Sequence, residues 1–262
     1  MSKIIFLGTC SGTEPMEGMH QCSWLLDTGE HIYWFDGGEC CGYTACTMGV
    51  DIMKTRALFV SHPHIDHVGG LPHLFFCINK LCSRYSKKLV CDNKLKVFFP
   101  DDRVFDAVIA LATTGSVGKL KFYIEKQRTF EGDLYADENI SVKAVHNRHL
   151  KWDDGKDGWH SFSFLVENGG KKLVFSGDVK APSELDAFLE GGADVLIMET
   201  GHHEVDRVCE YALSKGVKRL YLTHHGRQIL EERSHWEDFA EKFSRENNIT
   251  VKLCYDKMIE EL

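Results

Sequence analysis

The chain has 262 residues, 43% of them hydrophobic and 27% charged, values typical of a globular protein with its own core and not of a disordered or fibrous chain. Lys and Arg total 31 against 39 Asp and Glu, and the net charge of −8 argues against an overall basic surface for nucleic acid. Since the sequence has no export signal and no apolar run near the roughly 20 residues that span a bilayer, we expect a cytoplasmic protein without a membrane partner.

The first half of the chain alternates short apolar runs, typical of strands, with longer amphipathic stretches, typical of helices. The helix predicted over residues 101–115 has Asp at its start and Gly at its end, as helices often do. The predicted strands cover residues 3–8, 22–27, 31–36, 57–62 and 95–100, with several more between 120 and 145, and a second helix covers residues 71–85.

The second half repeats this alternation, with predicted strands at residues 160–167, 172–178, 194–200, 218–225 and 249–255 and helices at 181–192, 204–216 and 235–247. No internal repeat or Pro-rich linker divides the chain. We therefore predict one α/β domain over residues 1–262, in which two mixed sheets pack face to face with helices outside.

The motif with the clearest chemistry is SHPHIDHVGG, which directly follows the predicted strand ALFV. It places His62, His64, Asp66 and His67 within six residues. Imidazole suits zinc, and carboxylate also binds harder metals. A lone histidine is more often a structural residue, but so dense a set at the end of a strand predicts a metal site, which we place in a loop.

On these residues the chain resembles the metallo-β-lactamase superfamily, whose signature is H-x-H-x-D-H after a strand. Further family landmarks occur in order: IIFLGTCSGTEP, IYWFDGGE, KLVFSGD and RLYLTHHG. The opening FLGT and the FDGGE element are similar to those of the ribonuclease Z-like branch. The resemblance covers nearly the whole length and implies the four-layer αββα sandwich of this superfamily.

The resemblance also implies two divalent metal ions, for which Zn²⁺ suits the ligands and Mn²⁺ or Fe²⁺ are alternatives. One ion would be held by two histidines of the motif and a later histidine, the other by the rest of the motif and a histidine after a late strand, with one aspartate bridging the two. The implied ligands are His62, His64, Asp66, His67, His149, Asp178 and His224. Asp36 is expected to orient a ligand imidazole by accepting its second N–H.

One ligand is open between two histidines. Strand alternation favours His146, which shares a face with Val142 if the strand continues that far. The resemblance favours His149, seven residues after Val142, since related sequences place the ligand at that spacing. We predict His149.

The predicted catalytic residues are Asp66, Glu199 and His203. Asp66 would orient the nucleophile, and Glu199 would orient a histidine of the GHH segment. His203, or alternatively its neighbour His202, would donate a proton or contact a phosphate oxygen.

The resemblance implies a dinuclear-metal hydrolase that uses a metal-bridging hydroxide to cleave a phosphodiester, either a small molecule or an oligonucleotide. Ribonuclease Z-type tRNA 3′ processing is the second hypothesis, because no Gly/Pro-rich arm occurs between Val68 and Ile140 and the net charge is negative. A non-catalytic metal-binding or nucleic-acid-binding protein on this fold is the third. Relatives are commonly dimers, so a homodimer is also implied.

Overall fold

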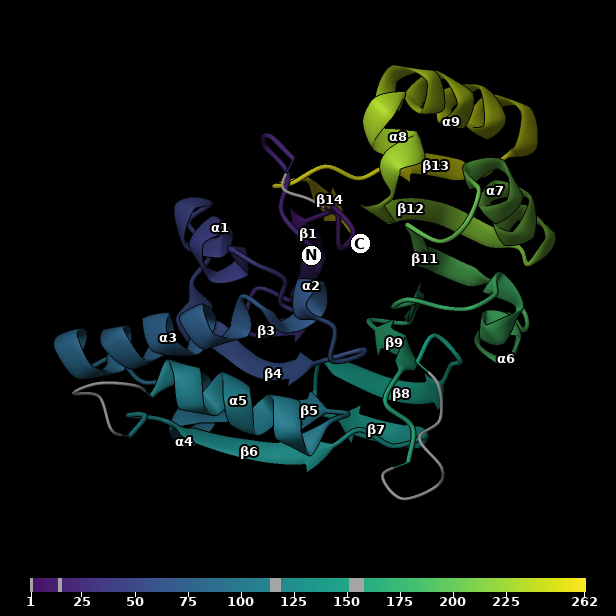
Figure 1. Ribbon diagram of the computed structural model, residues 1–262. Helices are drawn as coiled ribbons and strands as arrows, with labels where there is room; N and C mark the ends of the chain where they lie inside the picture. The colour runs from purple at the N-terminus through teal and green to yellow at the C-terminus, as the bar shows by residue number, and fades with distance from the viewer. Residues whose placement is uncertain (1, 14–15, 114–118, 151–157) are drawn as a thin grey trace. The chain divides into compact units, whose positions relative to one another are not determined.

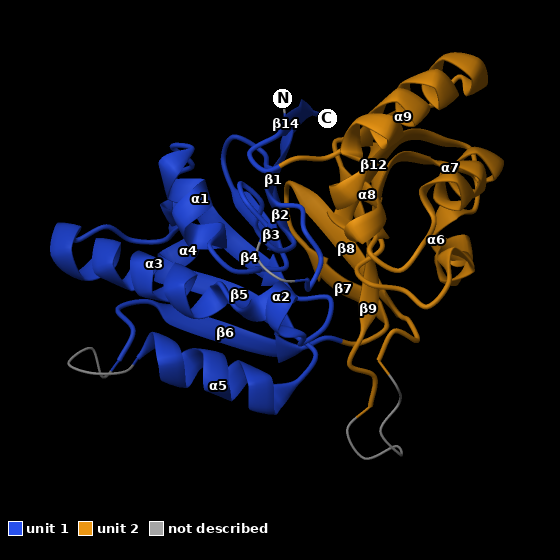
Figure 2. Ribbon diagram, turned by 45° about the horizontal axis from the view of Figure 1, so that its top comes forward, with its two compact units in different colours: residues 1–129, 256–262 blue, residues 130–255 orange. Residues whose placement is uncertain are grey.

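The computed structural model describes residues 2–13, 16–113, 119–150 and 158–262 (Figure 1). The chain divides into two compact units, Met1–Thr129 with Asp256–Leu262, and Phe130–Tyr255, which Figure 2 colours separately. Each unit has its own sheet and helices. The sequence-based assignment of one domain to residues 1–262 stays a prediction.

Among its described residues, unit 1 contains a seven-stranded sheet in the order β14-β1-β2-β3-β4-β5-β6. Pairing is antiparallel from β14 to β3 and parallel from β3 to β6, so the sheet is mixed. Its strands are β1 Lys3–Gly8, β2 Ser23–Asp27, β3 Ile32–Phe35, β4 Thr55–Phe59, β5 Lys94–Phe99, β6 Tyr123–Arg128 and β14 Ile259–Glu261. Its helices are α1 Cys41–Thr47, α2 Ile65–Val68, α3 Leu71–Tyr85, α4 Val90–Asn93 and α5 Asp102–Ala112, with a short 3₁₀ helix at Ile52–Lys54.

Both faces of this sheet are apolar, which explains why strands such as Ile32–Phe35 read as continuous hydrophobic runs. On one face, strand residues such as Trp34 and Leu58 pack with α1, α3 and α5 in one core cluster. The other face carries a row of stacked rings on neighbouring strands. The ring centroids are separated by 4.2 Å for Trp24–Phe35, 5.1 Å for Phe35–Phe59 and 4.9 Å for Phe59–Phe98.

Unit 2 has the corresponding arrangement, and its described strands form a seven-stranded mixed sheet in the order β13-β12-β11-β10-β9-β8-β7. Its strands are β7 Gly132–Ala136, β8 Ile140–His146, β9 Phe162–Asn168, β10 Lys171–Phe175, β11 Ala193–Thr200, β12 Val217–His225 and β13 Thr250–Leu253. Its helices are α6 Asp186–Leu189, α7 Val205–Ser214, α8 Arg227–Glu231 and α9 Arg233–Asn247, with a 3₁₀ helix at Pro182–Leu185. These helices and one face of β10 to β13 share a second core cluster.

The predicted strands and long helices are confirmed, with α3 matching its predicted range residue for residue. The predicted helix over 181–192 is split into a 3₁₀ turn and the short α6. The loop predicted for the histidine motif is wrong at Asp66 and His67, which lie on the four-residue helix α2. In the part of the chain that the structure describes, no helix has the length and apolar character to cross a membrane.

Candidate metal centre

The histidine motif of unit 1 begins where β4 ends. His62 is fully buried, and its Nε2 lies 3.0 Å from Nδ1 of His64. Two nitrogens bound to one tetrahedral zinc at about 2.0–2.1 Å lie roughly 3.3 Å apart. This pair of imidazoles is therefore already spaced as two ligands of one ion require.

Asp36, which directly follows β3, holds the histidine motif in place through three hydrogen bonds. Its buried carboxylate accepts the backbone N–H of Ser61 at 2.6 Å and the Ser61 hydroxyl at 2.7 Å. Its Oδ2 also accepts the Nδ1–H of His67 at 2.7 Å, which leaves the His67 Nε2 lone pair available for a metal. The contact predicted for Asp36 with a motif histidine is present, and its role in orienting a metal ligand stays a prediction.

The turn after Asp36 packs directly on the backbone of the motif. Gly37 donates its N–H to the carbonyl of His67 at 2.7 Å. A Cβ added at Gly38 would lie 2.5 Å from the backbone oxygen of Asp66, closer than real Cβ contacts, so only glycine fits there. The backbone of the FDGGE element thus packs directly against helix α2, which carries Asp66 and His67.

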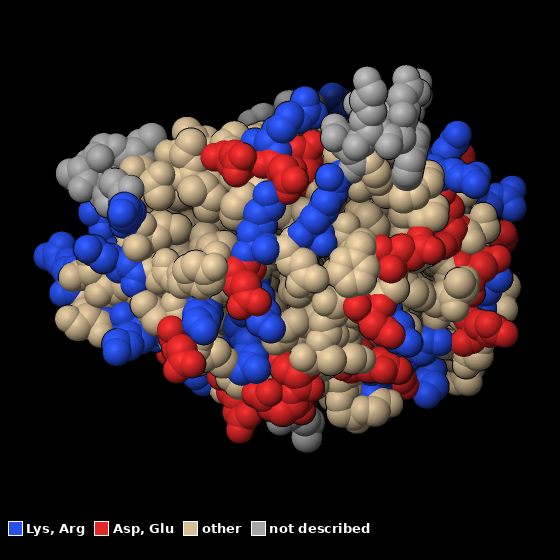
Figure 3. All heavy atoms as spheres, turned by 90° about the horizontal axis from the view of Figure 1, so that it is seen from below, with Lys and Arg blue, Asp and Glu red and all other residues tan. Residues whose placement is uncertain are grey.

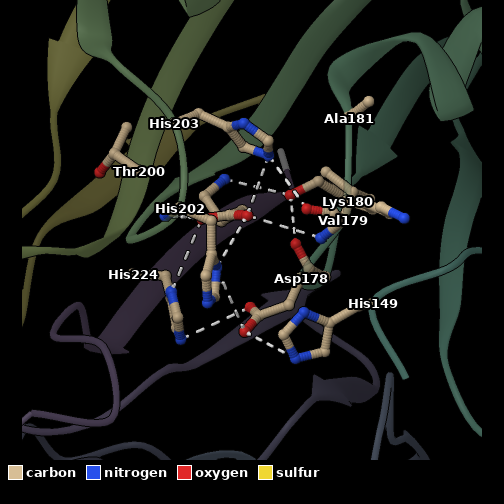
Figure 4. A network of polar contacts seen from close by, with 12 residues as sticks. His149, Asp178, Val179, Lys180, Ala181, Thr200, His202, His203 and His224 are labelled. Carbon is tan, nitrogen blue, oxygen red and sulfur yellow. Dashed lines mark hydrogen bonds and ion pairs between the residues drawn. The ribbon is translucent and has the colours of Figure 1, made fainter. Parts of the chain in front are cut away.

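In unit 2, Asp178 follows β10 and lies between two histidines (Figure 4). Its Oδ2 is 3.6 Å from Nε2 of His149, and its Oδ1 is 3.4 Å from Nε2 of His224. Oδ2 also lies 3.8 Å from Nδ1 of His202. The two oxygens of Asp178 could therefore each serve a metal ion, which is the bridging role predicted for this residue.

Buried polar groups hold these ligands in place. Asn147 is 1% exposed, and its Oδ1 accepts the Ser161 hydroxyl at 2.6 Å and the N–H of His149 at 3.2 Å. At the end of β12 the register with β11 shifts, and His224 adopts a left-handed φ of 52°. Such backbone conformations are costly for non-glycine residues and cluster at functional sites.

Glu199, on β11, binds both histidines of the GHH segment. Its Oε1 lies 3.1 Å from Nδ1 of His202 and 3.2 Å from Nε2 of His203, which also donates to the carbonyl of Val179 at 3.0 Å. Burial raises the pKa of a carboxyl group, but the hydrogen bonds from both histidines outweigh it and hold the pKa of Glu199 below its usual value. Burial lowers the pKa of an imidazole, but for His203 the bond and charge of Glu199 outweigh it and raise the pKa.

The structure separates the two histidines left open by the sequence. His149 lies beside Asp178, whereas His146 contacts the carboxylate of Glu131 and stacks on Trp159 with ring centroids 3.9 Å apart. His146 is the last residue of β8, as strand alternation assumed. His149 lies in the segment after β8, and this segment places its imidazole beside Asp178.

The predicted ligands divide between the units, with His62, His64, Asp66 and His67 in unit 1 and His149, Asp178 and His224 in unit 2. Sequence reasoning missed the supporting groups Ser61, Asn147 and Ser176. Ser176 accepts the N–H of Glu199 at its Oγ, at 3.1 Å. Single serines and asparagines after strands are too common to be recognised as supports without the structure.

The chain is similar to curated proteins named ribonuclease Z and ribonuclease BN and to solved structures of the metallo-β-lactamase fold. The sequence is 25% identical to ribonuclease Z of Picrophilus torridus in an alignment of 272 positions that covers 85% of each chain. It is 27% identical to ribonuclease BN of an Enterobacter species over 85% of this chain and 88% of that one. Among solved structures, human tRNase Z, short form, matches with a TM-score of 0.72 and 20% identity over 99% of this chain and 98% of that chain. The metallo-β-lactamase fold protein YhfI of Bacillus subtilis matches with a TM-score of 0.75 and 16% identity over 100% and 99%.

These similarities confirm the predicted metallo-β-lactamase fold and its ribonuclease Z-like branch, and they define the class of protein: a metal-dependent hydrolase. Within this class, the family model described as anti-Pycsar protein Apyc1 matches residues 2–247. The chain belongs to that family.

Proposed function

We propose that the protein is a phosphodiesterase whose predicted ligands hold two divalent metal ions, with Zn²⁺ in both positions. The arrangement of Asp178 between His149 and His224 carries the proposal, because one carboxylate presents a separate oxygen to each of two imidazoles. Two divalent ions held by these residues would lower the pKa of a bound water and neutralise the charge of a phosphodiester.

In the proposed reaction, the oxygen of a water forms a bond to phosphorus while the bond to the leaving oxygen breaks. Asp66 is 7% exposed and is proposed to orient the attacking water. The leaving oxygen must gain a proton, and Glu199 positions the two histidines that are candidates for supplying it.

The geometry favours His202 over His203 as the donor. The His203 side chain is 12% exposed and directs its Nε2 at a backbone carbonyl, whereas the His202 side chain is 45% exposed. His202 contacts Glu199 through Nδ1 at 3.1 Å, and its Nε2 is the atom that we propose carries the proton. We propose that His202 gives this proton and that Glu199 and His203 position it.

The relatives named ribonuclease Z make tRNA 3′ processing the second candidate. On the face of the molecule drawn in Figure 3, groups of Lys and Arg lie among groups of Asp and Glu, and the net charge of the chain is −8. Affinity for a polyanion depends on clustered Lys and Arg, so we favour a small phosphodiester.

From the family description alone, we further propose a role against Pycsar. The homodimer implied by the sequence stays a prediction.

Hydrolysis of bis-p-nitrophenyl phosphate by the protein with added Zn²⁺ or Mn²⁺ tests the proposal. We expect turnover that falls at least 100-fold in His202→Ala and less in His203→Ala, since general acid catalysis contributes about 10²–10⁴-fold. His235→Ala, on the surface of α9, is the matched control. Faster cleavage of a 3′-extended tRNA than of the small diester would favour tRNA processing, and no turnover of diesters, thioesters or lactones would favour the non-catalytic hypothesis.

A further inference from the structure

Helices α1 and α3 of unit 1 lie side by side and share one core cluster (Figures 1 and 2). Away from that core they carry two thiols and an imidazole. Cys46 on α1 and His73 on α3 are exposed, and Cys77 on α3 is half-buried. None of the three is among the predicted ligands of the candidate metal centre. The ten cysteines of the chain include no Cys-x-x-Cys pair, so spacing along the sequence does not reveal these residues as a group.

His73 and Cys77 already have the spacing of two ligands of one metal ion. They are four residues apart on α3 and therefore share one face of the helix. Sγ of Cys77 lies 3.6 Å from Nε2 of His73 and 3.9 Å from Nδ1. A thiolate and an imidazole nitrogen bound to one tetrahedral zinc, at about 2.3 Å and 2.0–2.1 Å, lie roughly 3.6 Å apart. The observed distance to Nε2 therefore fits a shared zinc ion.

Close packing of α1 on α3 brings a second thiol toward this pair. The two helices start from neighbouring points, because Gly70, just before α3, donates its N–H to the carbonyl of Gly37, shortly before α1, at 2.9 Å. Further along, a Cβ added at Gly42 would lie 3.1 Å from Cα of Leu74, so the two helix backbones are in close contact there. Contacts thus advance along both helices in the same direction, and the next turn of each helix continues the series.

That next turn carries Cys46, four residues after Gly42, and Cys77, three residues after Leu74. Burial, followed by the charge of Cys46, raises the pKa of the Cys77 thiol, which agrees with two sulfurs that lie close to each other. Burial also raises the pKa of the Cys46 thiol. A divalent cation removes the repulsion between two such thiolates, because it binds both sulfurs and its charge balances theirs.

We propose that Cys46, His73 and Cys77 form a further metal site, the surface zinc site, which binds one Zn²⁺ ion and holds α1 against α3. The inference does not depend on the proposed phosphodiesterase function. Two thiolates and an imidazole are ligands that zinc prefers, and water would take the fourth position. Each thiol gives its proton to solvent on binding, so the two thiolate charges balance the charge of the ion. Because α1 follows the FDGGE element and α3 follows α2, the ion would tie together the segments next to Asp36 and His67.

Titration of the fully reduced, metal-free protein with Co²⁺ tests this inference. Co²⁺ substitutes for Zn²⁺, and thiolate ligands give it an intense near-ultraviolet charge-transfer band that imidazole and carboxylate ligands do not give. We expect the band to saturate with about one Co²⁺ per chain and to disappear when Zn²⁺ is added. Cys46→Ser and Cys77→Ser should each remove the band, and His73→Ala should weaken Co²⁺ binding at this site by at least about 10-fold.

Two variants serve as controls and should retain the band. Cys91→Ser is matched, because Cys91 is also exposed and its Sγ lies 3.9 Å from Nε2 of His31. Cys22→Ser removes the sulfur that lies within 4.8 Å of a carboxylate oxygen of Asp36. No band in the wild-type protein, a band that survives Cys77→Ser, or a band that either control removes would overturn the assignment. A protein that shows the expected bands but hydrolyses no diester would support the surface zinc site and refute only the proposed function.

Discussion

Replacing Asp36 by Asn should weaken metal binding without removing any ligand. The wild-type carboxylate accepts three hydrogen bonds, two from Ser61 and one from His67. An amide of the same shape offers one acceptor oxygen and one NH₂ donor. If the oxygen stays on the Ser61 N–H, the NH₂ group meets Nδ1 of His67, which must then accept instead of donate.

The consequence is a change of tautomer in His67. With Nδ1 accepting, the proton moves to Nε2, the atom available for a metal ion. Loss of a partner that orients a ligand imidazole typically costs 10- to 100-fold in metal affinity, about 1.4–2.7 kcal/mol. The backbone should tolerate the change, because Asp36 has a left-handed φ of 58° and Asn adopts this conformation readily.

Competition with a zinc chelator measures the affinity, and urea unfolding of the metal-free protein measures stability separately. Asp106→Asn on the exposed face of α5 is the matched control. If the Asp36→Asn variant binds both ions with wild-type affinity, the predicted effect of the His67 tautomer on metal binding is wrong. Affinity lost only in proportion to the free energy of unfolding would show that Asp36 acts through the fold and not through His67.

Three further outcomes follow from the structure. Asp178→Ala should lower the metal content and abolish hydrolysis together, and full retention of both ions on metal analysis would contradict its bridging role. His149→Ala should lose about one ion per chain and most activity, while His146→Ala should keep both ions. Asp194→Asn should lower the free energy of unfolding by about 1–2 kcal/mol at pH 7, because a backbone N–H of β10 and the ammonium of Lys218 hold the pKa of this carboxyl below its usual value. Since that contribution is present above the unfolded pKa near 3.9 and is lost as pH falls through the lower folded pKa, urea curves of the two proteins should converge in acid.

The sequence predicted the elements that bury apolar surface. Strands such as Ile32–Phe35 and helix α3 follow from hydrophobic runs and helical periodicity, which burial imposes directly. Helix α2 was missed because its four residues Ile65–Val68 are too few to show a period. Strand β14 was missed because its sequence, Ile-Glu-Glu, has no apolar pattern and is specified only by pairing with β1.

The candidate site was predictable where a residue type carries its own chemistry. Histidines and aspartates at the ends of strands marked the ligands, and FDGGE marked Asp36. The choice between His146 and His149 was not predictable from alternation, because it depends on the turn held by Asn147. The same limit applies to His202 and His203, which are neighbours in sequence and differ in the exposure and the contacts of their imidazoles.

The two units position their buried carboxylates and imidazoles in the same way. In each, parallel strands end at a buried carboxylate that accepts or faces imidazoles, Asp36 in unit 1 and Asp178 in unit 2. In each, one non-glycine residue at a strand end has a left-handed φ, Asp36 at 58° and His224 at 52°. Because that conformation is costly, the surrounding core must impose it, and the rigid sheets supply the constraint. The positions of the predicted ligands are therefore fixed by the cores of the two sheets.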